Sequence, residues 1–125
     1  MGDGMKVRSC SVAGQFYPRE PYHLEQLVAG YLEAGEPLPG IRGIVSPHAG
    51  YPYSGAVAGR AFAALDPDFA GTFVLVGPSH RGYLTCASVI PWETPLGIVD
   101  TDAGFVQELG IPVDEFSHQG EHSLE

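Results

Sequence analysis

Long apolar runs are missing from this sequence of 125 residues. None approaches the roughly 20 consecutive apolar residues that a membrane-spanning helix needs. The first residues also lack the apolar core of a signal peptide. We therefore expect a protein of the cytoplasm.

Basic residues are scarce: 6 lysines and arginines stand against 15 aspartates and glutamates, which gives a formal net charge of -9. Nucleic acids and anionic membranes are themselves negatively charged, so this balance argues against both as partners. The charge carries no information about the fold.

Cysteine is rare as well. Cys10 and Cys86 lie far apart and neither belongs to a CxxC pair, which argues against a disulfide framework or a zinc knuckle. We expect both cysteines to be reduced and partly buried. Glycine and proline are frequent by contrast, with 17 and 11 residues and no repeat, and they mark the turns between elements.

Two segments in the first half have the pattern of helices. Residues 21–34 carry apolar side chains at helical spacing, which predicts an amphipathic helix. Residues 54–65 begin at Ser54, the expected N-cap, and are rich in glycine and alanine. This composition predicts a slim helix that lies close to a sheet.

Short apolar runs predict the strands. Residues 41–46 and 72–76 lack polar alternation, which is typical of strands buried on both faces, and the helical pattern between them favours a parallel pair. We expect an α/β fold with a mostly parallel central sheet and helices on both faces.

The second half continues with shorter elements. Residues 87–90 predict a third strand, and residues 92–97 predict a hairpin or an excursion between short strands. A helix capped by Asp100 or Thr101 is expected to run to about Leu109, and a short strand is expected over residues 111–116.

Two histidines follow the predicted central strands. Proline stops each strand, at Pro47 and Pro78; His48 directly follows the first proline, and His80 follows the second after one residue. Ligands in open parallel sheets bind beyond the carboxyl ends of the strands, so both imidazoles are candidates to line one crevice. Neutral imidazoles there suit iron, copper or zinc, whereas the simpler alternative is hydrogen bonding to loop backbone.

Other polar and aromatic residues are secondary candidates. Tyr51 and Tyr53 can bind an aromatic or phosphorylated ligand or simply pack in the turn, and Arg81 can attract an anion or remain a solvated surface group. We expect His23 and His118 to face solvent.

Four motifs resemble the Memo family, also known as AmmeMemoRadiSam system protein B, in order and approximate spacing across essentially the whole chain. They are residues 12–18 (VAGQFYP), 47–51 (PHAGY), 77–80 (GPSH) and 121–125 (EHSLE). The resemblance implies a fold similar to the class III extradiol dioxygenases, in which two histidines and a carboxylate hold non-haem iron. His48 and His80 match the two histidine positions.

The resemblance also implies that the remaining ligand, a cysteine in Memo-like proteins, lies beyond residue 125. His122, in the fourth motif, is then a catalytic acid/base or substrate-orienting group, or an added ligand, with Glu121 or Glu125 fixing its tautomer. Alternatively, His122 is an exposed residue of a frayed terminus.

These observations give two functional expectations for residues 1–125, which we interpret as the N-terminal half of one Memo-like domain. The first is a redox-linked pocket that holds iron or copper. The second is a non-catalytic module that binds phosphotyrosine-type or other acidic ligands, as the resemblance also implies, through Tyr51, Tyr53 and Arg81. A half domain leaves apolar surface uncovered, so self-association is expected.

Overall fold

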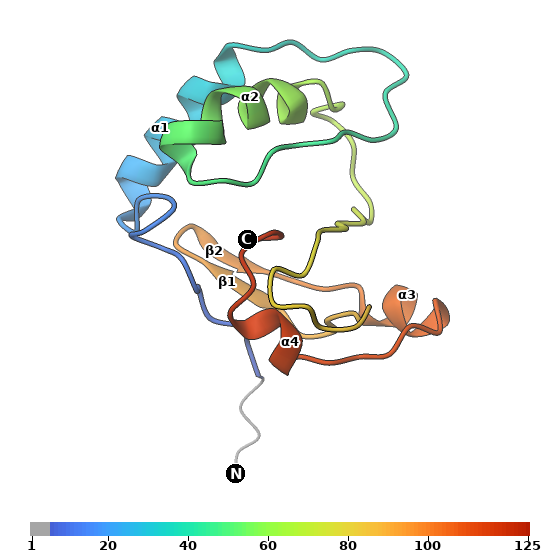
Figure 1. The fold of residues 1–125 in the computed structure, drawn as a ribbon. Helices are drawn as coiled ribbons and strands as arrows, with labels where there is room; N and C mark the ends of the chain where they lie inside the picture. The colour runs from blue at the N-terminus through green and yellow to red at the C-terminus, as the bar shows by residue number, and fades with distance from the viewer. Residues whose placement is uncertain (1–5) are drawn as a thin grey trace. The chain divides into compact units, whose positions relative to one another are not determined.

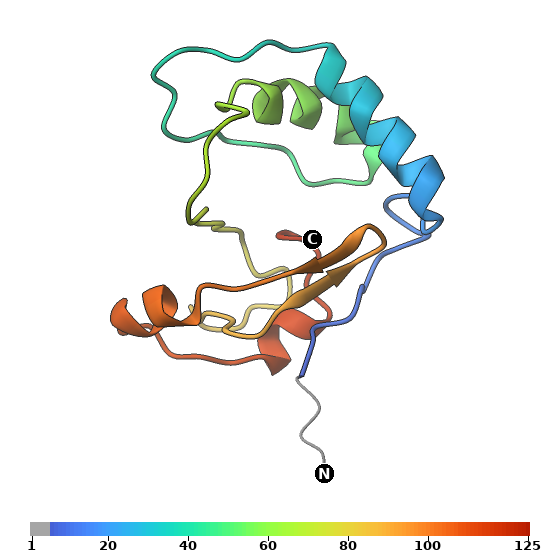
Figure 2. The ribbon, with the colours of Figure 1, turned by 180° about the vertical axis from the view of Figure 1, so that it is seen from behind.

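The computed structural model describes residues 6–125, so the first five residues of the expected domain over residues 1–125 lie outside the described residues. The chain divides into two compact units. The helix-pair unit is Ala13–Phe73, and the hairpin unit combines residues 6–12 with Val74–Glu125. Figures 1 and 2 show the elements of both units from opposite sides.

The helix-pair unit consists of α1 (Pro21–Glu33) and α2 (Tyr51–Ala63), which lie side by side (Figure 1). The Glu20 carboxylate caps α1 by accepting hydrogen bonds from the first backbone N–H groups of the helix. The apolar stripe of α1 buries Leu24. The helix predicted over residues 21–34 is therefore confirmed to within one residue.

Helix α2 begins three residues before the predicted start. Gly50 is its N-cap and Pro52 lies in the first turn, where a missing N–H costs no hydrogen bond. Ser54 lies inside the helix, and its hydroxyl donates to the carbonyl of Ala49 at 2.7 Å. The predicted cap at Ser54 is wrong, because the helix extends back to the proline.

The glycines of α2 allow close contact with α1 rather than with a sheet. A Cβ built on Gly59 would lie 2.6 Å from the Cβ and from the carbonyl oxygen of Tyr31, and one on Gly55 would lie 2.5 Å from the Tyr31 ring. The slim surface was predicted correctly, but the element that packs on it is α1.

The hairpin unit is built on an antiparallel pair, β1 (Trp92–Thr94) and β2 (Gly97–Val99), with Trp92 opposite Val99. This confirms the predicted hairpin. The unit also contains α3 (Ala103–Glu108) and α4 (Phe116–Gln119). Asp102 caps α3 by accepting from a backbone N–H, whereas we expected Asp100 or Thr101 as the cap.

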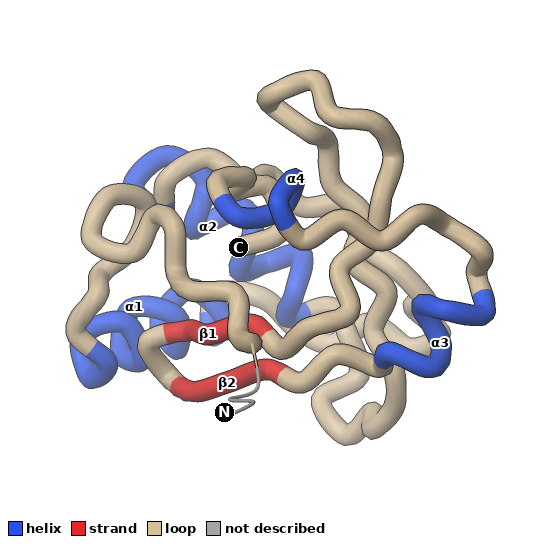
Figure 3. The backbone as a smooth tube through the Cα atoms, turned by 90° about the horizontal axis from the view of Figure 1, so that it is seen from below, coloured by secondary structure: helices blue, strands red, loops and turns tan. Residues whose placement is uncertain are grey.

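Within residues 6–125 the β1–β2 pair is the one regular sheet, drawn in red in Figure 3. The predicted central strands over 41–46 and 72–76 are loops instead, and Val45 and Val76 are 96% and 90% exposed. The third and fourth predicted strands meet only in a single parallel bridge, Ala87 to Val113.

The chain is thus an α/β protein, but the mostly parallel central sheet with helices on both faces is not formed in the described residues. An apolar run becomes a strand only when a neighbouring strand pairs with its backbone groups, and the run by itself does not supply that neighbour. Each helix in this part of the chain is too short or too polar to pass through a lipid bilayer.

Candidate metal centre

His80 is held by one carboxylate at two points. It follows residues 74–79 of the hairpin unit, which form neither helix nor strand, and its side chain is 44% exposed. Its backbone N–H donates to Oε1 of Glu121, and its ring Nδ1 lies 2.7 Å from Oε2 of the same residue. The ring orientation therefore depends on Glu121.

Glu121 is buried and strongly ionised. Burial raises the pKa of this carboxyl, but hydrogen bonds from the backbone and ring of His80 and from the backbone of Ser123, together with the charge of His80, outweigh burial and lower the pKa to about 2. At neutral pH the carboxylate can only accept. The proton of a neutral His80 ring is thus placed on Nδ1, and the lone pair on Nε2.

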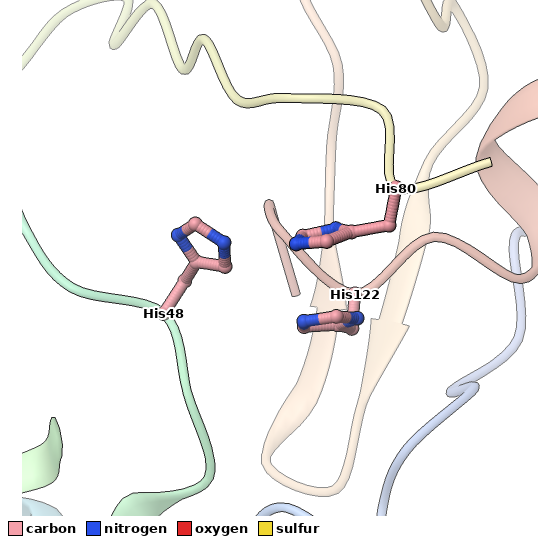
Figure 4. Close-up of side chains that lie close together, drawn as sticks. All are labelled: His48, His80 and His122. Atoms are coloured by element: carbon pink, nitrogen blue, oxygen red, sulfur yellow. The ribbon is translucent and has the colours of Figure 1, made fainter. Parts of the chain in front are cut away.

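His122 lies over His80 in the same unit. The two rings are stacked (Figure 4), and their centroids lie 4.3 Å apart with the planes inclined by 20°. A ring nitrogen of each histidine lies within 4.8 Å of the other. His122 Nδ1 also lies 3.9 Å from Oε2 of Glu121, so one carboxylate serves both imidazoles.

The two motifs that carry these histidines pack tightly on each other. A Cβ built on Gly77 would lie 2.6 Å from the Oγ of Ser123 and 2.9 Å from a methyl carbon of Leu124. The Ser123 hydroxyl is buried there without a hydrogen-bond partner among the described residues. Only glycine fits at position 77, and this close packing sets the distance between the segments.

His48 belongs to the helix-pair unit and extends from the loop that leads into α2 (Figure 4). The end of this loop is fixed, because the backbone N–H of Tyr51 donates to the carbonyl of Phe16 at 2.7 Å. The loop between the proline and the helix is therefore ordered at its helical end.

The three predicted ligand-binding residues occupy different surroundings. Tyr51 packs its ring against Tyr17 and Tyr31, at centroid distances of 5.5 and 6.1 Å, and lines a hollow of about 550 Å³ within the helix-pair unit. Tyr53 is 88% exposed on α2. Arg81, in the hairpin unit, lies against Gly120. Their roles in ligand binding stay predictions.

His118 contradicts its expected position in solvent, whereas His23 is exposed as expected. His118 is buried; its Nδ1 lies 2.9 Å from the carbonyl oxygen of Asp114, and its ring meets that of Trp92 edge-on at 6.0 Å. Asp114 is only four residues away, but Trp92 is distant along the chain. A polar flanking sequence gave no signal of this burial.

The contact between the Glu121 carboxylate and His80 was not predicted from the sequence. We expected Glu121 or Glu125 to fix the tautomer of His122, but Glu121 makes its short contact with His80, and Glu125 pairs with Arg8. The adjacency of acid and histidine in the fourth motif was a real signal of a paired imidazole. It did not reveal the second imidazole, because His80, which makes the shorter contact with Glu121, lies 41 residues away.

The donor set suits a transition metal. Neutral imidazoles are good ligands for iron, copper and zinc. A metal-binding histidine usually donates its other ring N–H to a carboxylate, and the His80–Glu121 pair has this arrangement. The hairpin unit thus offers two stacked imidazoles and one buried carboxylate that orients them.

Comparison with known proteins places these residues in a recognised sequence family. Residues 8–125 match the family described as Memo-like protein. A MEMO1 family protein of Methanosarcina barkeri is 44% identical over 125 residues, which cover 95% of this chain and 46% of the relative. The corresponding proteins of Nitrosopumilus maritimus and Archaeoglobus fulgidus are 37% and 43% identical, again over 95% of this chain and 49% and 46% of their own lengths. The chain spans about half the length of the curated relatives it matches.

Proposed function

Because this chain belongs to the Memo-like family, we propose that it supplies His48, His80 and His122 to a metal centre that holds iron or copper. The observation that carries the proposal is the His80–Glu121 pair, in which a buried carboxylate fixes the imidazole tautomer. A surface histidine without a ligand has no need of such a partner.

Each residue has a distinct part in the proposed centre. His80 presents Nε2, because Glu121 holds the proton on Nδ1. His122 is stacked beside it and adds a ligand or an acid/base group. His48 would join them from the loop before α2, and a further ligand, the cysteine that the resemblance implies, would come from the length of the relatives that this chain does not span.

Bound iron or copper would supply redox chemistry or oxygen chemistry at open coordination positions, as in the non-haem iron dioxygenases that the sequence resemblance implies. The residues of this chain would bind the metal, hold the Nδ1 proton of His80 and exclude water on the buried side of Glu121. Small-molecule substrates or phosphorylated peptides are the proposed ligands, and the cytoplasm is the proposed location.

Metal analysis tests the proposal. The 125-residue chain is loaded with Fe(II) or Cu(I) without oxygen, desalted and analysed, beside a His48→Ala, His80→Ala double variant and a His80→Ala, His122→Ala double variant. His23→Ala, at an exposed position on α1, is the matched control. We expect stoichiometric metal in the wild type and the control, and loss in both double variants.

A wild-type chain that stays empty would overturn the proposal. In that case, binding of phosphotyrosine without metal would favour the alternative, a non-catalytic module. Metal retained in the His80→Ala, His122→Ala variant would equally contradict the proposed ligand set.

A further inference from the structure

Arg8 is a buried cation with acceptors on every side. The residue is 3% exposed. Its Nε donates to the carbonyl of His118 at 3.1 Å, and its Nη2 donates to the carbonyls of Gln119 and Glu121 at 3.3 and 2.7 Å. Nη1 donates to the carboxylate of Glu125, and the guanidinium carbon lies 4.3 Å from the centroid of the Trp92 ring.

Glu125 links the C-terminal residues to the segment that carries Arg8. Besides Arg8, its carboxylate accepts hydrogen bonds from the backbone N–H groups of Ser11 and Val12, at 2.9 and 3.0 Å. We call Arg8 and Glu125 with these partners the Arg8 clamp. The clamp itself is anchored, because the backbone of Arg8 forms hydrogen bonds of 2.8 Å with the backbone of Pro91, just before β1, and of Glu93, within β1.

Glu121 is the point where the clamp meets the candidate metal centre. Arg8 binds its backbone carbonyl, while its carboxylate binds the backbone and ring of His80. The backbone of Glu121 is therefore held by the clamp, and its side chain is held by His80, a proposed ligand. A shift of the Glu121 backbone would move the carboxylate away from Nδ1 of His80 and would carry His122 with it.

We infer that Arg8 is a positioning residue for the metal centre: through the carbonyl of Glu121 it sets the tautomer of His80 and the place of His122. The inference rests on the proposed function for its metal-binding consequence, but the tautomer it assigns to His80 requires no metal. Lysine cannot replace arginine in this role, since one ammonium group cannot reach three carbonyls and a carboxylate in a planar fork.

The experiment compares Arg8→Lys with the wild-type chain, both free of metal. Long-range nitrogen–proton NMR of the histidine rings reports which nitrogen carries the proton near neutral pH. Titration with Co(II) alone then gives the metal affinity from its visible absorption. Arg42→Lys, at an exposed position of the helix-pair unit, is the matched control.

In the wild type and in Arg42→Lys, His80 is expected as the Nδ1–H form. In Arg8→Lys its signal moves toward the Nε2–H form, and Co(II) affinity falls about 10- to 100-fold, the usual loss when a group that orients a ligand is removed. A folded Arg8→Lys chain with the wild-type tautomer and affinity would overturn the inference.

Glu125→Gln keeps the inference testable if Arg8→Lys does not fold. It weakens the clamp while leaving the carbonyl contacts of Arg8 in place. The change in the His80 tautomer and the loss of Co(II) affinity are therefore expected to be smaller than in Arg8→Lys. An unchanged tautomer and affinity in folded Glu125→Gln would count against the clamp. If the wild-type chain binds no Co(II) and the tautomer of His80 nevertheless changes in Arg8→Lys, the proposed function is refuted and the positioning role of Arg8 is upheld.

Discussion

At the scale of single residues, the Glu121 carboxylate accepts hydrogen bonds from three N–H groups, two of His80 and one of Ser123. Glu121→Gln replaces one acceptor oxygen by an NH₂ group that faces these donors. We expect metal affinity to fall about 10- to 100-fold, since the orientation of His80 is lost. Co(II) titration measures the change, with Glu108→Gln on exposed α3 as the control. Equal affinities in the two variants would contradict the role of Glu121.

Asp114 provides a pH-dependent prediction away from the candidate ligands. The Ser117 hydroxyl, donating at 2.7 Å, is the main reason that the pKa of Asp114 lies below its usual value of 3.8. Ser117→Ala should raise this pKa toward the usual value, which carbon NMR of the carboxyl group measures during an acid titration. Ser46→Ala, in the helix-pair unit, serves as the control.

The sign of the accompanying stability change follows from the direction of the shift. A lowered pKa in the folded state means that the ionised Asp114 stabilises the fold above about pH 3.8 and that this contribution is lost as the pH falls below it. The free energy of unfolding of Ser117→Ala should therefore depend less on pH in that acid range. A steeper dependence than in the wild type would refute the assignment.

Gly77 tests the contact between the two histidine-bearing motifs. A methyl group there would lie 2.6 Å from the Oγ of Ser123, so Gly77→Ala must push the His122 segment aside. We expect the free energy of unfolding to fall by about 1–3 kcal/mol, as is usual for overpacking. Gly104→Ala in α3 meets only one atom, at 3.9 Å, and should be neutral or slightly stabilising. Urea unfolding of both variants gives the comparison.

At the scale of elements, α1 and α2 pack closely because glycines on one face of α2 have no side chains. A Cβ on Gly59 would meet the backbone of Tyr31, which cannot yield as a flexible side chain can. Gly59→Ala should cost about 1–3 kcal/mol, whereas Gly30→Ala on α1, with no atom within 4 Å, should stabilise the helix by up to about 1 kcal/mol. Thermal unfolding followed by circular dichroism distinguishes the two.

Helices α1, α2 and α3 and the hairpin could be predicted from the sequence because their causes are local, whereas α4 was not predicted. The apolar spacing that buries Leu24 in α1 and the turn between β1 and β2 both lie within a few residues. The caps were harder: Pro52 extended α2 past Ser54, because a proline in the first turn supports a helix start. The central strands were not predictable in this chain, since strand formation depends on neighbours.

The candidate site shows the same division between local and distant causes. His80 and His122 were recognisable from their motifs, and the structure brings them together. The acceptors of the Arg8 side chain lie 110 to 117 residues further along the chain, and no local pattern marks a buried arginine among backbone carbonyls. Whether the predicted ligands bind metal stays a prediction that the metal analysis decides.

At the scale of the whole molecule, two apolar runs expose valine side chains. The chain spans about half of each of the relatives it matches. Its two extended apolar runs, over residues 43–45 and 73–76, include Val45 and Val76, which are almost fully exposed. Exposed apolar segments with unpaired backbone groups favour association with other chains. We therefore propose that these runs are the surfaces through which copies of the chain self-associate.

Sedimentation velocity over a range of micromolar concentrations tests this association. The wild type should sediment as an oligomer, and a Val45→Lys, Val76→Lys double variant should move toward the monomer, because each lysine resists strand pairing and apolar contact. A Leu38→Lys, Leu96→Lys variant adds the same charge at exposed apolar positions outside the two runs and should keep the wild-type behaviour. If the wild type is a monomer at every concentration, the apolar runs do not mediate association. If both variants dissociate alike, the added charge itself is the cause, and the two runs have no special part in it.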